Sequence, residues 1–184
     1  MPGRVLIAHS SGPQGPGEGS SPFAQRLREG LGPEYEVLLP LMPAPEDPHY
    51  RPWSEHLAEL LERDGPAIVL GHSLGGSVAL KHLAERGGGG QMTGLITVAA
   101  PFWGTADWEA EWALPGDWPS GESELPPIFL FHSRDDEEIS VDHLERYAER
   151  LPDATVQVLD GNGHLYDRGD LTPILSAVWS LSAS

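Results

Sequence analysis

The pentapeptide Gly-His-Ser-Leu-Gly at positions 71–75 carries the clearest chemistry in the chain. Its serine, Ser73, has a glycine two places before it and two places after it, the spacing of a nucleophile on a sharp strand-to-helix turn. Small residues are needed there because a Cβ would collide with neighbouring backbone. We predict Ser73 as an acyl-transfer nucleophile and the N–H of Leu74 as the first oxyanion donor. The alternative is a glycine-rich turn without a catalytic role.

The general base should be a histidine beyond the acid if a triad follows the chain order Ser, Asp or Glu, His. Three histidines lie beyond the helix that follows the serine: His132, His143 and His164. His132 ends an apolar run before the acids, and His143 falls on a predicted helix. His164 follows the last apolar run in a flexible glycine loop, from which an imidazole can reach the strand ends. We predict His164 as the base; the alternative is an exposed loop histidine.

Four consecutive acids, Asp135, Asp136, Glu137 and Glu138, follow the apolar run at residues 128–131. One of them should orient the imidazole of the base, and the other three fit a solvated charge run. A divalent metal site is not favoured because no second cluster of oxygen ligands at calcium-loop spacing accompanies the run. No metal site is predicted.

The elements that must position these groups alternate between strand and helix patterns, which favours an α/β fold around a parallel sheet. Short apolar runs predict six strands, at residues 5–8, 35–39, 67–70, 95–99, 128–131 and 155–159. Apolar residues at helical spacing predict five helices, at residues 23–31, 53–61, 77–86, 144–151 and 171–181. Functional groups then belong at the carboxyl ends of the strands.

Residues 102–127 break this rhythm and contain four of the six tryptophans: Trp103, Trp108, Trp112 and Trp118. The indoles of this segment could simply pack on the domain, or the segment could cover a ligand cleft, and the two are compatible. In a parallel sheet the loop after the fourth strand lies beside the serine turn. We therefore assign Phe102 and Trp103, together with His72, to the substrate pocket.

Composition limits the classes of function. The chain has 184 residues, 39% of them hydrophobic, which predicts one domain over residues 1–184. Its 28 acidic and 11 basic residues give a net charge of −17, which disfavours nucleic acid as a partner. The absence of cysteine excludes thiol nucleophiles, disulfides and cysteine-ligated zinc. The first apolar run is too short for a signal peptide or a membrane span, so we expect a cytoplasmic protein without membrane contact.

Over nearly its whole length the chain resembles the α/β-hydrolase superfamily, and more narrowly the small capless serine hydrolases of the retinoblastoma-binding protein 9 family. The residues that carry the resemblance are those at 71–76, those at 129–139 and the pair Gly163 and His164. The resemblance implies six parallel strands in the order 2-1-3-4-5-6, helices on both faces and no large cap domain. It also selects Asp136 as the acid, because the family uses the second of two adjacent aspartates.

The chain departs from the family pattern at two places. After the first strand, Ser10 stands where the superfamily usually has glycine, so the second oxyanion donor is the N–H of either Ser11 or Ser10. Ser140 follows Ile139 at a position where the family usually has proline. This change should loosen the loop that carries the acid without removing the acid itself.

The expected reaction is hydrolysis of a small carboxylic ester or related acyl compound through an acyl-enzyme. Ser73 attacks, His164 transfers the proton and Asp136 holds the imidazole. No cofactor is required, the partner is a small-molecule substrate, and the sequence does not indicate a protein partner. Two alternatives stay open: a binding or scaffold protein with weak catalysis, and a thioesterase or peptidase that uses the same triad.

Overall fold

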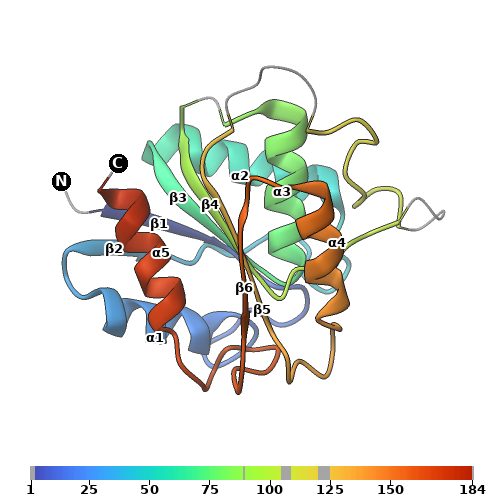
Figure 1. Ribbon diagram of the computed structural model, residues 1–184. Helices are drawn as coiled ribbons and strands as arrows, with labels where there is room; N and C mark the ends of the chain where they lie inside the picture. The colour runs from blue at the N-terminus through green and yellow to red at the C-terminus, as the bar shows by residue number, and fades with distance from the viewer. Residues whose placement is uncertain (1–2, 89, 105–108, 120–124, 184) are drawn as a thin grey trace.

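A parallel six-stranded sheet forms the centre of the protein (Figure 1). The computed structural model describes residues 3–88, 90–104, 109–119 and 125–183. Its strands are β1 (Gly3–Ala8), β2 (Tyr35–Leu38), β3 (Ala67–His72), β4 (Met92–Val98), β5 (Ile128–Ser133) and β6 (Thr155–Leu159). They lie in the order β2-β1-β3-β4-β5-β6 and every neighbouring pair is parallel. The predicted strand order is confirmed.

Helices cover both faces of the sheet. They are α1 (Ser21–Leu31), α2 (Tyr50–Asp64), α3 (Leu74–Arg86), α4 (Asp142–Arg150) and α5 (Thr172–Ser182). Helices α1 and α5 share one apolar core with the sheet, and α2, α3 and α4 share a second core on the opposite face. Figure 1 shows α1 and α5 together at the lower left, α2 and α3 in the upper part and α4 at the right. The predicted two-faced arrangement is confirmed.

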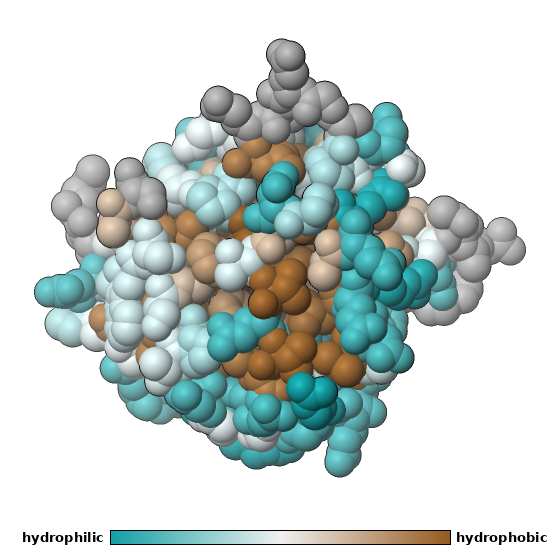
Figure 2. Space-filling model, viewed as in Figure 1, coloured by the Kyte–Doolittle hydropathy of each residue, from teal (hydrophilic) through white to brown (hydrophobic). Residues whose placement is uncertain are grey.

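The inner strands form because most of their residues are apolar and both of their faces are covered. Every residue of β3 is buried. The edge strand β6 is different, since four of its five residues are exposed. Figure 2 shows apolar side chains over β6, where Val156 and Val158 are 40% and 37% exposed.

Element boundaries differ from the sequence prediction where polar or glycine residues hide the pattern. Strands β3 and β5 each continue two residues past their apolar runs, through buried polar side chains at His72 and Ser133. Helix α3 begins at Leu74, whereas the sequence pattern predicts a start at residue 77. The pattern misses the first turn because Gly75 and Gly76 lie in it, and glycine is a poor helix former. These extensions set the positions of the functional residues.

The strand ends are joined by backbone hydrogen bonds that continue beyond the regular ladder. Ser73 N–H donates to the carbonyl of Val98 at 2.9 Å, and Arg134 N–H donates to the carbonyl of Leu159 at 2.8 Å. The turns that follow β3, β5 and β6 are therefore fixed to the sheet. None of the helices formed by the described residues is long and apolar enough to cross a membrane.

The tryptophan-rich segment divides between two places. Trp112 joins a small apolar cluster with Met42, Tyr50, Trp53, Leu74 and Val78, and half-buried Trp103 packs against this cluster. Trp118 instead joins the core under α2, α3 and α4. Trp108 lies outside the described residues. The indoles that are described thus pack on the domain, and only Trp103 and Trp112 lie beside the serine turn through Leu74.

Candidate active site

Ser73 lies on a strained turn between β3 and α3. Its φ of +52° and ψ of −123° fall outside the regions that non-glycine residues usually occupy. A Cβ at Gly71 would come within 2.4 Å of the Gly76 Cα, and a Cβ at Gly75 within 2.2 Å of the Ala8 carbonyl oxygen. The predicted need for glycine on both sides of the serine is confirmed, and a third glycine, Gly76, is part of the same close packing.

His164 and Asp136 complete a hydrogen-bonded series that starts at this serine. His164 Nε2 lies 3.0 Å from Ser73 Oγ, and His164 Nδ1 lies 2.9 Å from Asp136 Oδ2. Because an ionised carboxylate can only accept, His164 carries its proton on Nδ1, and Nε2 accepts the hydrogen of the serine hydroxyl. The serine and histidine are 8% and 9% exposed, so the series is almost shielded from water.

Asp136 is held as an ionised acceptor. Its Oδ1 receives the backbone N–H groups of Glu138 and Ile139, both at 2.9 Å, and its side chain is fully buried. Burial by itself would raise the pKa of this carboxyl. Donors from His132, His164 and the Ile139 N–H outweigh burial and hold the pKa well below its usual range. Asp136 therefore stays charged wherever the imidazole can act.

The neighbouring Asp135 organises the loop that carries His164. Its Oδ1 accepts the Ser133 hydroxyl at 2.5 Å and the N–H groups of Gly161 and Gly163 at 3.1 Å. These hydrogen bonds, the Ser133 hydroxyl first among them, lower the pKa of Asp135 to about 2. Asp135 is exposed, as expected of a solvated charge run, but it also joins the turn after β6 to the end of β5.

The loop of His164 is consequently not the flexible segment that its glycines indicate. Asn162 N–H donates to Ser133 Oγ at 3.1 Å, and the Asn162 side chain donates to the carbonyls of Arg168 and Asp170. Tyr166, just past His164, is fully buried. The glycines serve local geometry instead, since Gly161 and Gly163 have φ of +80° and +60°.

His72 links the His164 loop to the loop after β1. His72 Nε2 lies 2.8 Å from the His164 carbonyl oxygen and Nδ1 lies 2.8 Å from Ser20 Oγ. Burial lowers the pKa of His72 to about 3, so the ring is neutral. Nε2–H then donates to the carbonyl, and the Ser20 hydroxyl donates to Nδ1. His72 is fully buried, so its assignment to the substrate pocket is wrong: it supports the site from beneath.

The two candidates for the second oxyanion donor differ in their partners. The Ser10 N–H donates to Ser20 Oγ at 2.9 Å and is therefore already used. Ser11 is exposed at the rim of the same loop. Leu74 opens helix α3, so its N–H is one of the first N–H groups, which have no acceptor within the helix. This arrangement favours Leu74 and Ser11 over Ser10.

Two of the residues assigned to the substrate pocket have different surroundings. The Trp103 ring lies 6.1 Å from the Trp112 ring, in the cluster that includes Leu74. The Phe102 ring lies 4.9 Å from the Tyr147 ring and 4.4 Å from the Arg146 guanidinium, both on α4. Trp103 thus lies on the Leu74 side, whereas Phe102 packs against α4.

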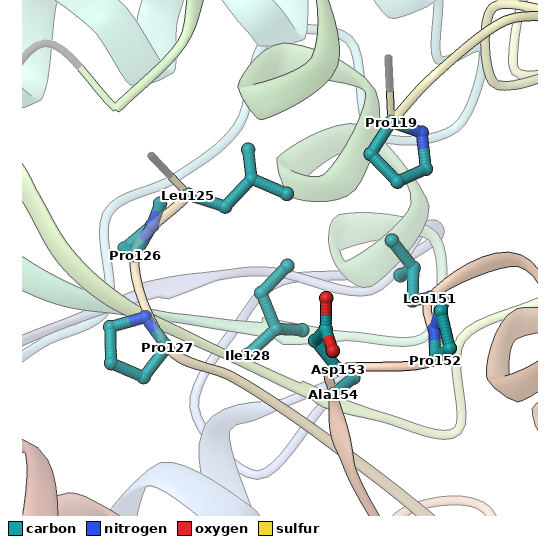
Figure 3. Close-up of a pocket in the computed structure, with 9 residues that line it drawn as sticks. All are labelled: Pro119, Leu125, Pro126, Pro127, Ile128, Leu151, Pro152, Asp153 and Ala154. Atoms are coloured by element: carbon teal, nitrogen blue, oxygen red, sulfur yellow. The ribbon is translucent and has the colours of Figure 1, made fainter. Parts of the chain in front are cut away.

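Hollows in the described surface lie at both ends of the strands. A small one, of about 180 Å³, borders His164 and is lined by Asp135, Glu137, Glu138, Gly163, Leu165, Asp167 and Arg168. A larger one, of about 510 Å³, lies at the amino ends of β5 and β6 and is lined mainly by prolines and apolar residues (Figure 3). This larger hollow is therefore at the opposite end of the strands from Ser73. Among the described residues, no three His, Asp or Glu side chains converge as a metal site requires.

Comparison with known proteins places this geometry in a family. The serine hydrolase family model matches residues 41–174, well over half of the chain. The chain belongs to the serine hydrolase family. No curated protein matches it.

Solved structures share the fold of this serine hydrolase at low sequence identity. The ydeN gene product from B. subtilis matches with a TM-score of 0.70 and 16% identity, covering 99% of this chain and 100% of that one. The esterase RhEst1 from a Rhodococcus species matches with a TM-score of 0.73 and 18% identity, covering 100% and 91%. An alpha/beta hydrolase enzyme from the metagenome of lagoon sediments gives 0.70 and 16%, covering 100% and 90%. The fold is that of an α/β-hydrolase without a large cap.

Three residues that shape the site had weak signals in the sequence. Ser20 is one serine among several in a Gly- and Pro-rich loop, with no pattern that separates it from its neighbours. Asp135 is indistinguishable in type from the acids beside it. His132 was set aside as a base because it precedes the acids, although its place at the end of a strand already put it near them.

Proposed function

We propose that this serine hydrolase cleaves small carboxylic esters through an acyl-enzyme, with Ser73, His164 and Asp136 as its triad. The observation that carries the proposal is the continuous hydrogen-bonded series from Asp136 through His164 to a serine on a strained strand-to-helix turn. No part of this chemistry needs a cofactor.

In the first half-reaction, Ser73 Oγ attacks the substrate carbonyl carbon while its proton passes to His164 Nε2. The carbonyl oxygen becomes an oxyanion that accepts the N–H groups of Leu74 and Ser11. When the carbon–oxygen bond to the alcohol breaks, the imidazolium returns its proton to the departing alcohol. Asp136 stabilises the imidazolium throughout without taking its proton.

In the second half-reaction, water attacks the acyl-serine and gives one proton to His164 Nε2. The serine oxygen leaves and takes that proton back, which releases the carboxylic acid. The acyl group is proposed to lie against Leu74 and Trp103, because Leu74 follows Ser73 directly and belongs to an apolar cluster with Trp103, and neither residue lines the charged hollow at His164.

The charged hollow favours neutral esters over acyl-CoA thioesters. Four of its lining residues are acids and one is basic, and Glu138 Oε2 lies 3.7 Å from His164 Nε2. The phosphates of coenzyme A would meet this negative potential as well as the net charge of −17. Any activity toward acyl-CoA should therefore rise with salt concentration, whereas activity toward neutral p-nitrophenyl esters should change little.

The decisive experiment compares the wild-type protein with Ser73→Ala on p-nitrophenyl esters of increasing chain length. We expect kcat to fall at least ~10³-fold, because only the oxyanion donors and substrate binding remain. The substitution removes one oxygen and leaves the fold intact. A fluorophosphonate should label the wild type covalently and leave the variant unlabelled.

The same experiment decides between an enzyme and a scaffold protein. If the wild type neither hydrolyses any ester of the panel nor reacts with the fluorophosphonate, the binding-protein alternative gains support. If Ser73→Ala retains hydrolysis and labelling, the nucleophile has been misassigned.

A further inference from the structure

A second histidine lies against the acid of the proposed triad. His132 belongs to β5 and is 1% exposed. Its Nε2 lies 2.8 Å from the Ile139 carbonyl oxygen and 3.1 Å from Asp136 Oδ2. The reaction steps above make no use of this buried imidazole.

The neighbours of Nε2 fix its protonation. A carbonyl oxygen and a carboxylate oxygen can only accept hydrogen bonds, so Nε2 has to carry a hydrogen. The N–H donates to Ile139 and also presents its positive end to Asp136 Oδ2. His132 therefore donates from Nε2 to the loop that carries Asp136 and Ile139, both as a neutral ring with its hydrogen on Nε2 and as a doubly protonated ring.

His132 closes a ring of contacts around the carboxylate. The Ile139 N–H donates to Asp136 Oδ1 at 2.9 Å, and the Ile139 carbonyl receives the His132 N–H. Both carboxylate oxygens are thus held through the same turn, one directly by Ile139 and one beside His132. The imidazole itself is anchored by β5, which pairs with β4 on one side and β6 on the other.

We propose that His132 is a positioning residue for the reaction: from β5 it clamps the Ile139 carbonyl and Asp136 Oδ2, and so fixes the orientation in which Asp136 meets His164. The proposal rests on the triad assigned above. It predicts that His132 affects the chemical step through Asp136, since the partners of its Nε2 are the Ile139 carbonyl and Asp136 Oδ2.

Removal of the donor should release the acid loop. Without the His132 N–H, the buried Ile139 carbonyl loses its donor and Asp136 Oδ2 keeps only His164. The carboxylate can then rotate away from the direction that suits the imidazole. We expect activity to fall about 10-fold to 100-fold, the size of effect seen when an outer hydrogen-bond partner of a metal-bound side chain is removed.

Two substitutions separate the donor from the bulk of the ring. His132→Leu keeps an apolar side chain of similar size and removes the N–H, whereas the amide nitrogen of His132→Gln can donate near the position of Nε2. We expect His132→Leu to lower kcat about 10-fold to 100-fold with KM changed less than about 2-fold. The rate of fluorophosphonate labelling should fall with kcat, and His132→Gln should recover most of both.

The matched control is His82→Leu. His82 is also a buried histidine, 4% exposed, and its Nδ1 is hydrogen-bonded to Ser54, between α2 and α3 and away from the acid loop. Its replacement should lower the melting temperature and leave kcat near the wild-type value. If His82→Leu and His132→Leu lower kcat equally at equal loss of melting temperature, the role of His132 is only structural and the proposal is overturned.

A second measurement does not depend on hydrolysis. The proton on His164 Nδ1, held at 2.9 Å from Asp136, should give a low-field proton NMR resonance, assigned by its loss in His164→Asn. His132→Leu should shift or broaden this resonance, and His82→Leu should leave it in place. An unmoved resonance together with wild-type kcat in His132→Leu would overturn the proposal. Failure of the proposed function has a different signature, because the wild type would then be inactive or Ser73→Ala would stay active, while the NMR comparison still decides whether His132 positions Asp136.

Discussion

The two sides of the Ser73 hydroxyl are built in different ways. The polar side, made of Ser10, Ser20, His72, Asp135, Asp136 and His164, is held by hydrogen bonds, and all of these residues except Asp135 are buried or have a buried side chain. The aromatic side, made of Met42, Tyr50, Trp53, Leu74, Trp103 and Trp112, is held mainly by apolar packing. Hydrogen bonds fix angles as well as distances, whereas apolar packing fixes volume.

The contrast matches what each side has to do. Proton transfer between Ser73 and His164 needs a fixed direction, and the polar side supplies it from several strand ends at once. An acyl group needs a surface of suitable size, which can change residue by residue without disturbing the proton path. Substitutions on the polar side should therefore change kcat, and substitutions on the aromatic side should change which substrate is preferred.

The largest test of the polar side compares two adjacent acids. Asp136→Asn should lower kcat about 10³-fold to 10⁴-fold, because the amide no longer favours the productive tautomer of His164. Asp135→Asn should lower it much less, about 10-fold, because an amide oxygen can still accept the N–H groups of Gly161 and Gly163. Equal steady-state kinetics for the two variants, both folded by circular dichroism, would show that the acid has been misplaced.

A smaller effect is expected at Ser20, which joins the two loops of the polar side. Ser20→Ala leaves the Ser10 N–H and His72 Nδ1 without their partner. We expect kcat to fall about 10-fold, because the loop after β1 that carries Ser10 and Ser11 can then shift. The free energy of unfolding should fall by about 1–3 kcal/mol. Ser21→Ala is the control, since that hydroxyl bonds only to the carbonyls of Gly15 and Glu18. Indistinguishable kcat values for the two variants would remove Ser20 from the site.

Acid should destabilise the protein through two buried histidines: His72 of the polar side, and His9, whose Nδ1 accepts the Ser20 N–H. Burial lowers the pKa of His9 to about 4 and that of His72 to about 3, from an ordinary 6.5. Between pH 6.5 and these values the unfolded chain holds protons that the folded protein does not. The free energy of unfolding should therefore fall as pH falls through this window, by about 1.4 kcal/mol per pH unit for each histidine.

Urea denaturation at several pH values between 7 and 5 measures this slope. His9→Gln should reduce the slope of unfolding free energy against pH by about 1.4 kcal/mol per pH unit, which corresponds to one proton, because glutamine does not titrate. Parallel slopes for the wild type and His9→Gln would mean that His9 titrates normally in the folded state.

The sequence predicts most of the polar side because its chemistry restricts residue type and order. Local backbone geometry and reaction geometry together impose three patterns: Ser73 between glycines, acids after the fifth strand, and His164 after the sixth. Asp135, Ser20 and His132 could not be predicted in the same way. Their roles depend on contacts between loops far apart in the chain, and serine, aspartate and histidine are common in loops for other reasons.

The aromatic side was harder to predict for a different reason. Four tryptophans in one segment indicate burial, but indoles pack in many directions and do not show which neighbours they meet. The structure separates Trp112, beside Leu74, from Trp118, in the core under α3. The sequence assigns Phe102 and Trp103 to one pocket, and it does not show that Phe102 packs against Tyr147 while Trp103 packs against Trp112.

The last and smallest effect tests the aromatic side through chain length. Each methylene buried against Trp103 should contribute about 0.8 kcal/mol, or about 4-fold in kcat/KM, until the space is filled. Trp103→Ala should move the preferred ester toward longer chains. Trp112 is only 7% exposed, so Trp112→Ala would cost about 3–5 kcal/mol, and Trp112→Phe is the better variant.

Trp118→Phe is the matched control, because Trp118 is 8% exposed and packs in the other core. It should lower the melting temperature about as much as Trp112→Phe and leave the chain-length profile unchanged. Profiles of kcat/KM across the ester series decide the matter. If Trp103→Ala and Trp112→Phe also leave the profile unchanged, the aromatic side has no part in acyl selection. Substrate choice then rests on the loops around Ser11 and His164, and the division between the two sides of Ser73 no longer holds.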